Sequence, residues 1–90
     1  MITTRDLLNR LMVEKQLLSL REVARYLDIT HSTVQKWKNG GTMSDEMACE
    51  IADTLGLDVD LTMLAIIIER SKNEGAIEAL RRLEENQKIA

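Results

Sequence analysis

Two short helical patterns separated by only a few residues constrain the fold of this 90-residue chain more than any other feature. The first pattern runs from Leu20 to about Leu27, and the second runs from His31 to about Lys38. Two helices joined by a turn of three to four residues must cross steeply. The crossing needs a small residue at the contact, which Ala24 supplies, and apolar residues on both sides. We expect these apolar residues to be Val23, Leu27, Ile29, Val34 and Trp37.

Capping signals support both helices of this pair. Ser19 and Glu22 fit a capping box, in which the Ser hydroxyl accepts from a free helix N–H and the Glu carboxylate reaches back. Thr30 is placed to cap the second helix of the pair. Asn39-Gly40-Gly41 ends that helix, because Gly tolerates the left-handed conformation that a helix C-terminus often needs.

Two further helices are expected on either side of the pair. Thr3 or Thr4 caps a first helix that runs to about Lys15. Ser44 caps a helix after the pair, and Gly56 ends it. Its apolar residues recur with the helical period of 3.6. They are Met47, Ala48, Ile51, Ala52 and Leu55.

The last third of the chain is also helical in pattern. Asp58 or Asp60 opens a helix that continues through Leu61 to about Ser71, and an amphipathic segment follows. Whether Gly75 separates these two helices stays open at this level. The apolar face of the last segment consists of Ala76, Ile77, Leu80 and Leu83. No period-2 strand pattern is present, so we expect an all-α fold of five or six short helices.

Composition excludes several classes of protein. A single cysteine, Cys49, excludes an intramolecular disulfide framework and a multi-cysteine zinc site. The longest nearly apolar stretch, residues 61–68, is far shorter than the ~20 residues of a membrane span. No signal-peptide pattern is present, so we expect a cytoplasmic protein with no membrane partner. No Gly-rich phosphate loop or acid–base pair is evident, which predicts a non-enzymatic protein without cofactor or metal.

Charge is unevenly distributed along the chain. Residues 1–43 contain seven basic and four acidic residues, and residues 44–90 contain five basic and eleven acidic residues. A basic first half can face a polyanion while the acidic half stays in water. Two ordinary solvated helix faces would give the same counts, so charge alone does not decide between these interpretations.

The crossed pair carries a family resemblance. Ala24 at the contact, Ile29 closing the turn, Val34 within the second helix and the ending Trp37-Lys38-Asn39-Gly40 occur together. This combination resembles the helix-turn-helix domain of the lambda repressor and Cro class, an XRE-like group of DNA-binding proteins. The resemblance covers about residues 3–57.

Two positions depart from the pattern of that class. Asp28 stands where a Gly is usual, and Ser44 stands where a Pro often opens the next helix. Asp tolerates the left-handed region better than most residues, and a capping Ser serves the same helix start. The layout of the whole chain also resembles the small repressors of filamentous phages, through Ser44-Asp45-Glu46, the Gly-Leu-Asp after that helix, and Glu69-Arg70.

The resemblance implies that the helix 31–38 lies in the major groove of DNA. Gln35 would then contact adenine, and Lys36 would reach guanine or a phosphate. Arg21 and the residues that end the helix would meet the phosphate backbone, which positions without specifying. The alternative is an ordinary exposed helix face. The implied DNA-binding residues are Arg21, His31, Ser32, Thr33, Gln35, Lys36, Lys38, Asn39 and Thr42.

Residues 61–68 are apolar nearly all round, and such a helix must be buried on more than one side. A partner subunit could cover one side; the alternative is a central helix of a monomer. We therefore expect a helix-turn-helix region in residues 1–58 and a helical dimerisation region in residues 59–90, within one domain. The expected dimerisation residues are Leu64, Ile67, Ile68, Ile77 and Leu80.

These expectations together describe a homodimeric, sequence-specific repressor of a phage or mobile element. Two recognition helices about 34 Å apart would read an inverted-repeat operator on double-stranded DNA. Assembly beyond the dimer on DNA and binding of an antirepressor stay open. Three alternatives also stay open: a lysogeny-type activator or excisionase, an antitoxin whose C-terminal part binds a toxin, and a helical protein that does not bind DNA.

Overall fold

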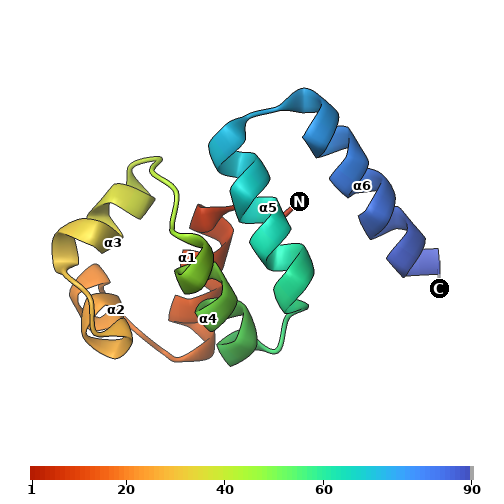
Figure 1. Ribbon diagram of the computed structural model, residues 1–90. Helices are drawn as coiled ribbons and strands as arrows, with labels where there is room; N and C mark the ends of the chain where they lie inside the picture. The colour runs from red at the N-terminus through yellow and green to blue at the C-terminus, as the bar shows by residue number, and fades with distance from the viewer. Residues whose placement is uncertain (90) are drawn as a thin grey trace.

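The computed structural model describes residues 1–89, with side-chain surroundings described through residue 86 (Figure 1). It contains six helices and, within residues 1–89, no strand, which confirms the expected all-α fold. None of the described helices is long and apolar enough to cross a membrane. The helices are α1 (Thr4–Glu14), α2 (Leu20–Leu27), α3 (His31–Lys38), α4 (Asp45–Leu55), α5 (Val59–Ser71) and α6 (Glu74–Ile89).

Side-chain caps begin the helices, mostly at the residues that the sequence indicates. Thr3 caps α1, and with Asp6 it forms a complete capping box. The Thr30 hydroxyl accepts from the Thr33 N–H at 3.3 Å, and the Ser44 hydroxyl accepts from the Met47 N–H at 3.2 Å. Asp58, rather than Asp60, begins α5 by accepting from the Leu61 N–H at 3.0 Å.

The expected capping box at the start of α2 is only half formed. The Ser19 hydroxyl accepts from the Glu22 N–H at 3.2 Å, as predicted. The Glu22 carboxylate accepts from the Leu18 N–H at 2.5 Å, one residue before the predicted donor. The Glu22 carboxylate therefore accepts from a backbone N–H in the linker before α2 rather than from the backbone N–H of the cap residue, Ser19.

The boundary between α5 and α6 lies before Gly75. Lys72 adopts a left-handed conformation, with φ of 56°, and ends α5. The Asn73 side-chain oxygen then accepts from the Ala76 N–H at 2.9 Å, and the Asn73 carbonyl accepts from the Ile77 N–H at 3.0 Å. Gly75 lies in the first turn of α6, so the reversal of the chain at Lys72 and Asn73 does not depend on a glycine.

One core joins the first four helices, and α5 adds Ile66 to it. A second, smaller cluster lies between α5 and α6 and consists of Ala65, Ile68 and Leu80, with Ala76 and Ile77 partly buried beside it. The expectation that Leu83 points inward was wrong, because 50% of its surface is exposed. Leu80 is the buried residue of the expected face, Ala76 and Ile77 are partly buried, and Leu83 faces solvent.

The order of packing places the α2–α3 pair and α6 at opposite ends of the molecule. Contacts run from α2 to α3, from both α3 and α4 to α1, and then from α4 to α5 and from α5 to α6. Figure 1 accordingly shows α2 and α3 at one end of the molecule and α6 at the other. The extents of the molecule along its principal axes are 37, 25 and 17 Å.

Candidate nucleic-acid interface

The turn between α2 and α3 is built on a left-handed aspartate. Asp28 has φ of 57° and ψ of 48°. The Ile29 N–H donates to the Ala24 carbonyl at 2.9 Å, and the Asp28 N–H donates to the Arg25 carbonyl at 3.3 Å. These two hydrogen bonds form a Schellman motif, which ends α2 and turns the chain at once. Asp28 therefore takes the conformation that the usual glycine would take, as the sequence predicts.

The expected apolar residues hold α2 against α3. Ala24 is 5% exposed and belongs to the main core with residues of both helices. Ile29 is partly buried and packs against the main core. The remaining predicted members are buried, which confirms the interpretation of Trp37 as a core residue; they are Val23, Leu27, Val34 and Trp37.

The opposite face of α3 is polar and open to solvent. It carries no acidic residue. Ser32, Gln35 and Lys36 are exposed on it, and His31 is half-buried at its start. Because Val34 and Trp37 anchor the back of the helix, the orientation of this face is set by the core. Amide, hydroxyl and ammonium groups on a rigid helix are the groups that hydrogen-bond to base edges and phosphates.

Thr33 differs from the other predicted contacts of α3. Its side chain is half-buried, and its hydroxyl lies 2.8 Å from the hydroxyl of Thr30. The Thr30 hydroxyl also lies 3.3 Å from that of Ser32. The structure therefore assigns the Thr33 hydroxyl to the start of the helix, where it stabilises the cap.

A shallow hollow between α2 and α3 brings basic groups together. Arg21, Arg25 and His31 line it together with Ala24 and Ile29. Arg25 was not predicted as a DNA-binding residue. Its position four residues after Arg21 is the signal that could have found it, because such residues lie on one helix face.

The loop after α3 requires glycine at two positions. Gly40 has φ of 101°, and a Cβ at Gly41 would lie 2.9 Å from the Lys36 carbonyl oxygen. Lys38 and Asn39 stay exposed beside this loop, and Thr42 is half-buried within it. The guanidinium of Arg5, which the sequence interpretation did not single out, donates to the Lys38 carbonyl at 2.6 Å and ties α1 to the end of α3.

The predicted dimerisation residues lie away from this surface and divide into two groups. Ile68 and Leu80 are 8% and 2% exposed because they pack in the cluster between α5 and α6 of one chain. Leu64 is 37% exposed, and Ile67 and Ile77 are partly buried. Dimerisation through these residues stays a prediction, and Leu64 is the member with the most free surface.

Metal chemistry finds no support in the described side chains. Among them, no group of three or more His, Cys, Asp or Glu residues is placed to hold a metal ion. Cys49 is partly buried on α4. The groups that the fold brings together at the α2–α3 end are hydrogen-bonding and cationic groups.

The crossed helices and their acid-free outer helix define a class of protein, the small helical DNA-binding regulators. A family model described as Helix-turn-helix matches residues 10–61, more than half of the chain, and the chain belongs to this lambda-repressor-like family of DNA-binding transcriptional regulators. The match includes all of α2, α3 and α4 and ends within α5. The comparison with curated proteins gave no match, and neither did the comparison with solved structures.

Proposed function

We propose that this protein is a sequence-specific repressor that binds an inverted-repeat operator as a homodimer. The observation that carries the proposal is the exposed pair Gln35 and Lys36 on a helix whose opposite face is buried at Val34 and Trp37. Gln can bond adenine through two groups, and Lys can bond guanine O6 and N7. Occupation of a promoter by the dimer would block transcription without catalysis.

Pairing of two chains is supported by the apolar surface that α5 leaves uncovered. Leu64 is exposed, and Ile67 is partly exposed on the same helix. A dimer places two recognition helices about 34 Å apart, one turn of DNA. The similarity of the chain layout to small repressors of filamentous phages supports repression, rather than activation, and a phage or mobile-element origin.

Selection of bound sequences from random duplex DNA, repeated at several salt concentrations, tests the proposal. We expect an enriched inverted repeat with half-sites one helical turn apart, because a symmetric dimer reads the same half-site twice. We also expect affinity to fall steeply with salt, because each neutralised phosphate releases counterions. The double variant Gln35→Ala and Lys36→Ala is the control, and it should lose the enrichment. Flat enrichment with the unaltered protein would refute specific binding.

Sedimentation of Leu64→Lys tests the pairing. A charge placed in a dry interface is strongly unfavourable, so this variant should sediment as a monomer. Leu18→Lys is the matched control, because Leu18 is an 86% exposed leucine in the helix-turn-helix region. It should remain a dimer. Ile68→Lys is unsuitable for this test, since Ile68 is buried within one chain and its substitution would disturb the fold itself.

The position of the selected operator distinguishes the regulatory alternatives. An operator that overlaps a promoter, with transcription reduced by the protein, supports repression. Operators upstream of a promoter with increased transcription would indicate an activator. A monomer that becomes stable only with a second protein on α5 would indicate an antitoxin instead.

A further inference from the structure

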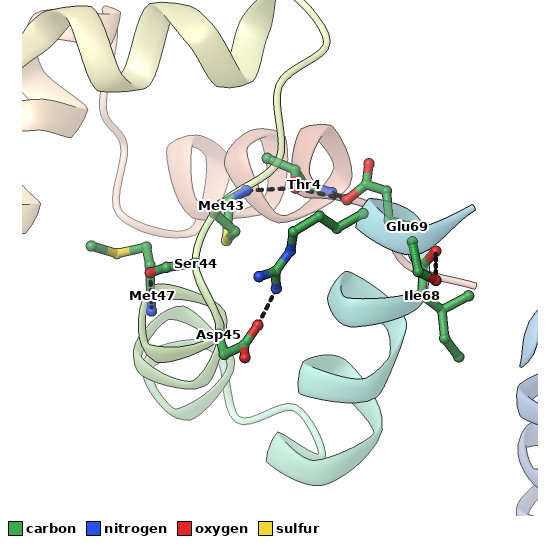
Figure 2. Close-up of polar contacts among 9 residues, drawn as sticks. Thr4, Met43, Ser44, Asp45, Met47, Ile68 and Glu69 are labelled. Carbon is green, nitrogen blue, oxygen red and sulfur yellow. Dashed lines mark hydrogen bonds and ion pairs between the residues drawn. The ribbon is translucent and has the colours of Figure 1, made fainter. Parts of the chain in front are cut away.

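One buried hydroxyl connects three segments that are distant in the sequence. Thr4, in the first turn of α1, is 1% exposed. Its hydroxyl donates to Oε1 of Glu69 at 2.7 Å, and its backbone N–H donates to the same oxygen at 2.9 Å. The same hydroxyl accepts from the Met43 N–H at 3.1 Å (Figure 2). The last turn of α5 is therefore linked through one side chain to the segment that follows the recognition helix.

The chemistry of this link requires a carboxylate or an equivalent acceptor at residue 69. The first N–H groups of a helix have no partner within the helix, and the Thr4 N–H is one of them. A negative side chain is also favoured at the positive end of a helix. Glu69 thus caps α1 from another helix, and a charged acceptor makes both hydrogen bonds stronger than neutral ones.

The segment 39–44 is held at both ends by neighbours of this link. Before it, the Arg5 guanidinium donates to the Lys38 carbonyl at the end of α3. After it, Arg70 forms an ion pair with Asp45 in the first turn of α4 (Figure 2). Between these two contacts lie Gly40 and Gly41, which restrain the backbone least. Val34 and Trp37 set which face of α3 is open to solvent, and the contacts at the ends of this segment add to the core in fixing how the end of α3 lies relative to α4.

We propose that Glu69 is a positioning residue for DNA recognition, which fixes Thr4 and Met43 and through them the end of α3. This inference rests on the proposed sequence-specific binding. Base-edge contacts require the helix to lie at one depth and angle in the groove, whereas contacts of flexible Lys and Arg side chains with phosphates tolerate a shift. Loss of the link therefore lowers affinity for the operator more than affinity for random DNA.

The test compares Glu69→Leu with Glu69→Gln on the selected operator and on a random duplex of equal length. Glu69→Leu should reduce the ratio of operator affinity to random affinity about tenfold, within the range of coupling between distant sites, with random affinity changed less than about twofold. Glu69→Gln should restore most of the ratio, because the amide oxygen accepts from both donors of Thr4. Glu78→Leu, the same change at an exposed position of α6, is the matched control.

The outcomes separate this inference from a structural role and from failure of the proposed function. A folded Glu69→Leu with an unchanged ratio overturns the inference, even if its thermal stability falls. Equal losses on both DNAs overturn it as well. A ratio near one for the unaltered protein refutes specific binding itself.

If Glu69→Leu does not fold by circular dichroism, Glu69→Asp decides the question, because it keeps the charge and shortens the reach by one methylene. A reduced ratio supports the inference, and an unchanged ratio overturns it.

Discussion

The first 58 residues and the two C-terminal helices are held by different amounts of buried surface. Helices α1–α4, with Met43 before α4, contribute eleven buried apolar residues to the main core. Through residue 86, α6 contributes one fully buried side chain, Leu80. Both regions consist of short amphipathic helices, so the spacing of apolar residues in the sequence does not show how many of them become buried. The helix-turn-helix region completes its core within itself and α5, whereas α6 packs on one neighbour.

The ends of the helices show the same contrast. Four helices, α1 to α4, end in Schellman motifs, with left-handed residues at Gln16, Asp28, Gly40 and Gly56. A Schellman motif contains two backbone hydrogen bonds. The end of α5 at Lys72 has one backbone hydrogen bond, from the Lys72 N–H to the Ile68 carbonyl at 2.8 Å. The two bonds at each of the first four turns restrain the chain more strictly than the single bond at the end of α5.

The largest expected effect compares one leucine from each region. Leu11→Ala, in the main core, should lower the free energy of unfolding by about 2–5 kcal/mol, because the surrounding helices cannot close the cavity. Leu80→Ala should cost less, because α6 can move toward α5. Urea unfolding measures the first effect, and hydrogen exchange measures the protection of α6 in the second. Equal losses of global stability would show that the two regions unfold as one unit and would break the comparison.

Most of the fold was predictable because local chemistry and the global fold agree in the first 58 residues. Caps at Thr30 and Ser44, the small Ala24 and the glycines after α3 each specify their structure locally. The left-handed conformations of Gln16 and Lys72 were not predictable in this way, although the two helices end close to the expected Lys15 and Ser71. Both residues adopt positive φ without being Gly, Asn or Asp, and their conformation follows from the packing of the helices on either side.

The candidate site was predictable to the extent that it lies on one helix face. The polar face of α3 follows from the period of 3.6, because Val34 and Trp37 mark the opposite side. The link from Glu69 to Thr4 spans 65 residues and leaves no local pattern. Ile68 and Leu80 were expected to pair two chains, and within one chain they lie in the cluster between α5 and α6, so their part in dimerisation stays a prediction. An apolar stripe in the sequence predicts that a helix face is buried, but it does not show whether the same chain or a partner covers that face.

The next effect sharpens the functional side of the comparison. Gln35→Ala should weaken operator binding by about 1–3 kcal/mol and relax the preference at one base pair. Lys38→Ala should weaken operator and random DNA similarly, because a phosphate contact carries no sequence information. Titrations on both DNAs measure the two variants. If Gln35→Ala lowered the affinity for operator and for random DNA equally, Gln35 would not read a base pair.

A smaller effect tests the turn that joins α2 and α3. Asp28→Ala should destabilise the protein by about 1 kcal/mol, because the left-handed conformation disfavours a residue with a Cβ and no polar side chain. Asp28→Gly should leave stability nearly unchanged or raise it, since Gly adopts this conformation without strain but loses more chain entropy on folding. Thermal unfolding compares the three proteins. Identical midpoints for Ala and Gly would show that the positive φ of 57° carries no strain.

The smallest expected effect concerns the charged contact between the two regions. Arg70 and Asp45 pair across α5 and α4, but their side chains are 47% and 46% exposed. Exposed pairs contribute about 0–1 kcal/mol and are screened by salt, so Arg70→Ala should lose little stability at low salt and nothing at about 1 M. Arg81→Ala, which removes the more exposed pair with Glu78 on α6, is the control. If Arg70→Ala lost as much stability in urea as Ile66→Ala, which removes the residue that α5 adds to the main core, charge rather than apolar packing would join α5 to the helix-turn-helix region. The difference between the two regions would then lie in the kind of contact and not in the amount of buried surface.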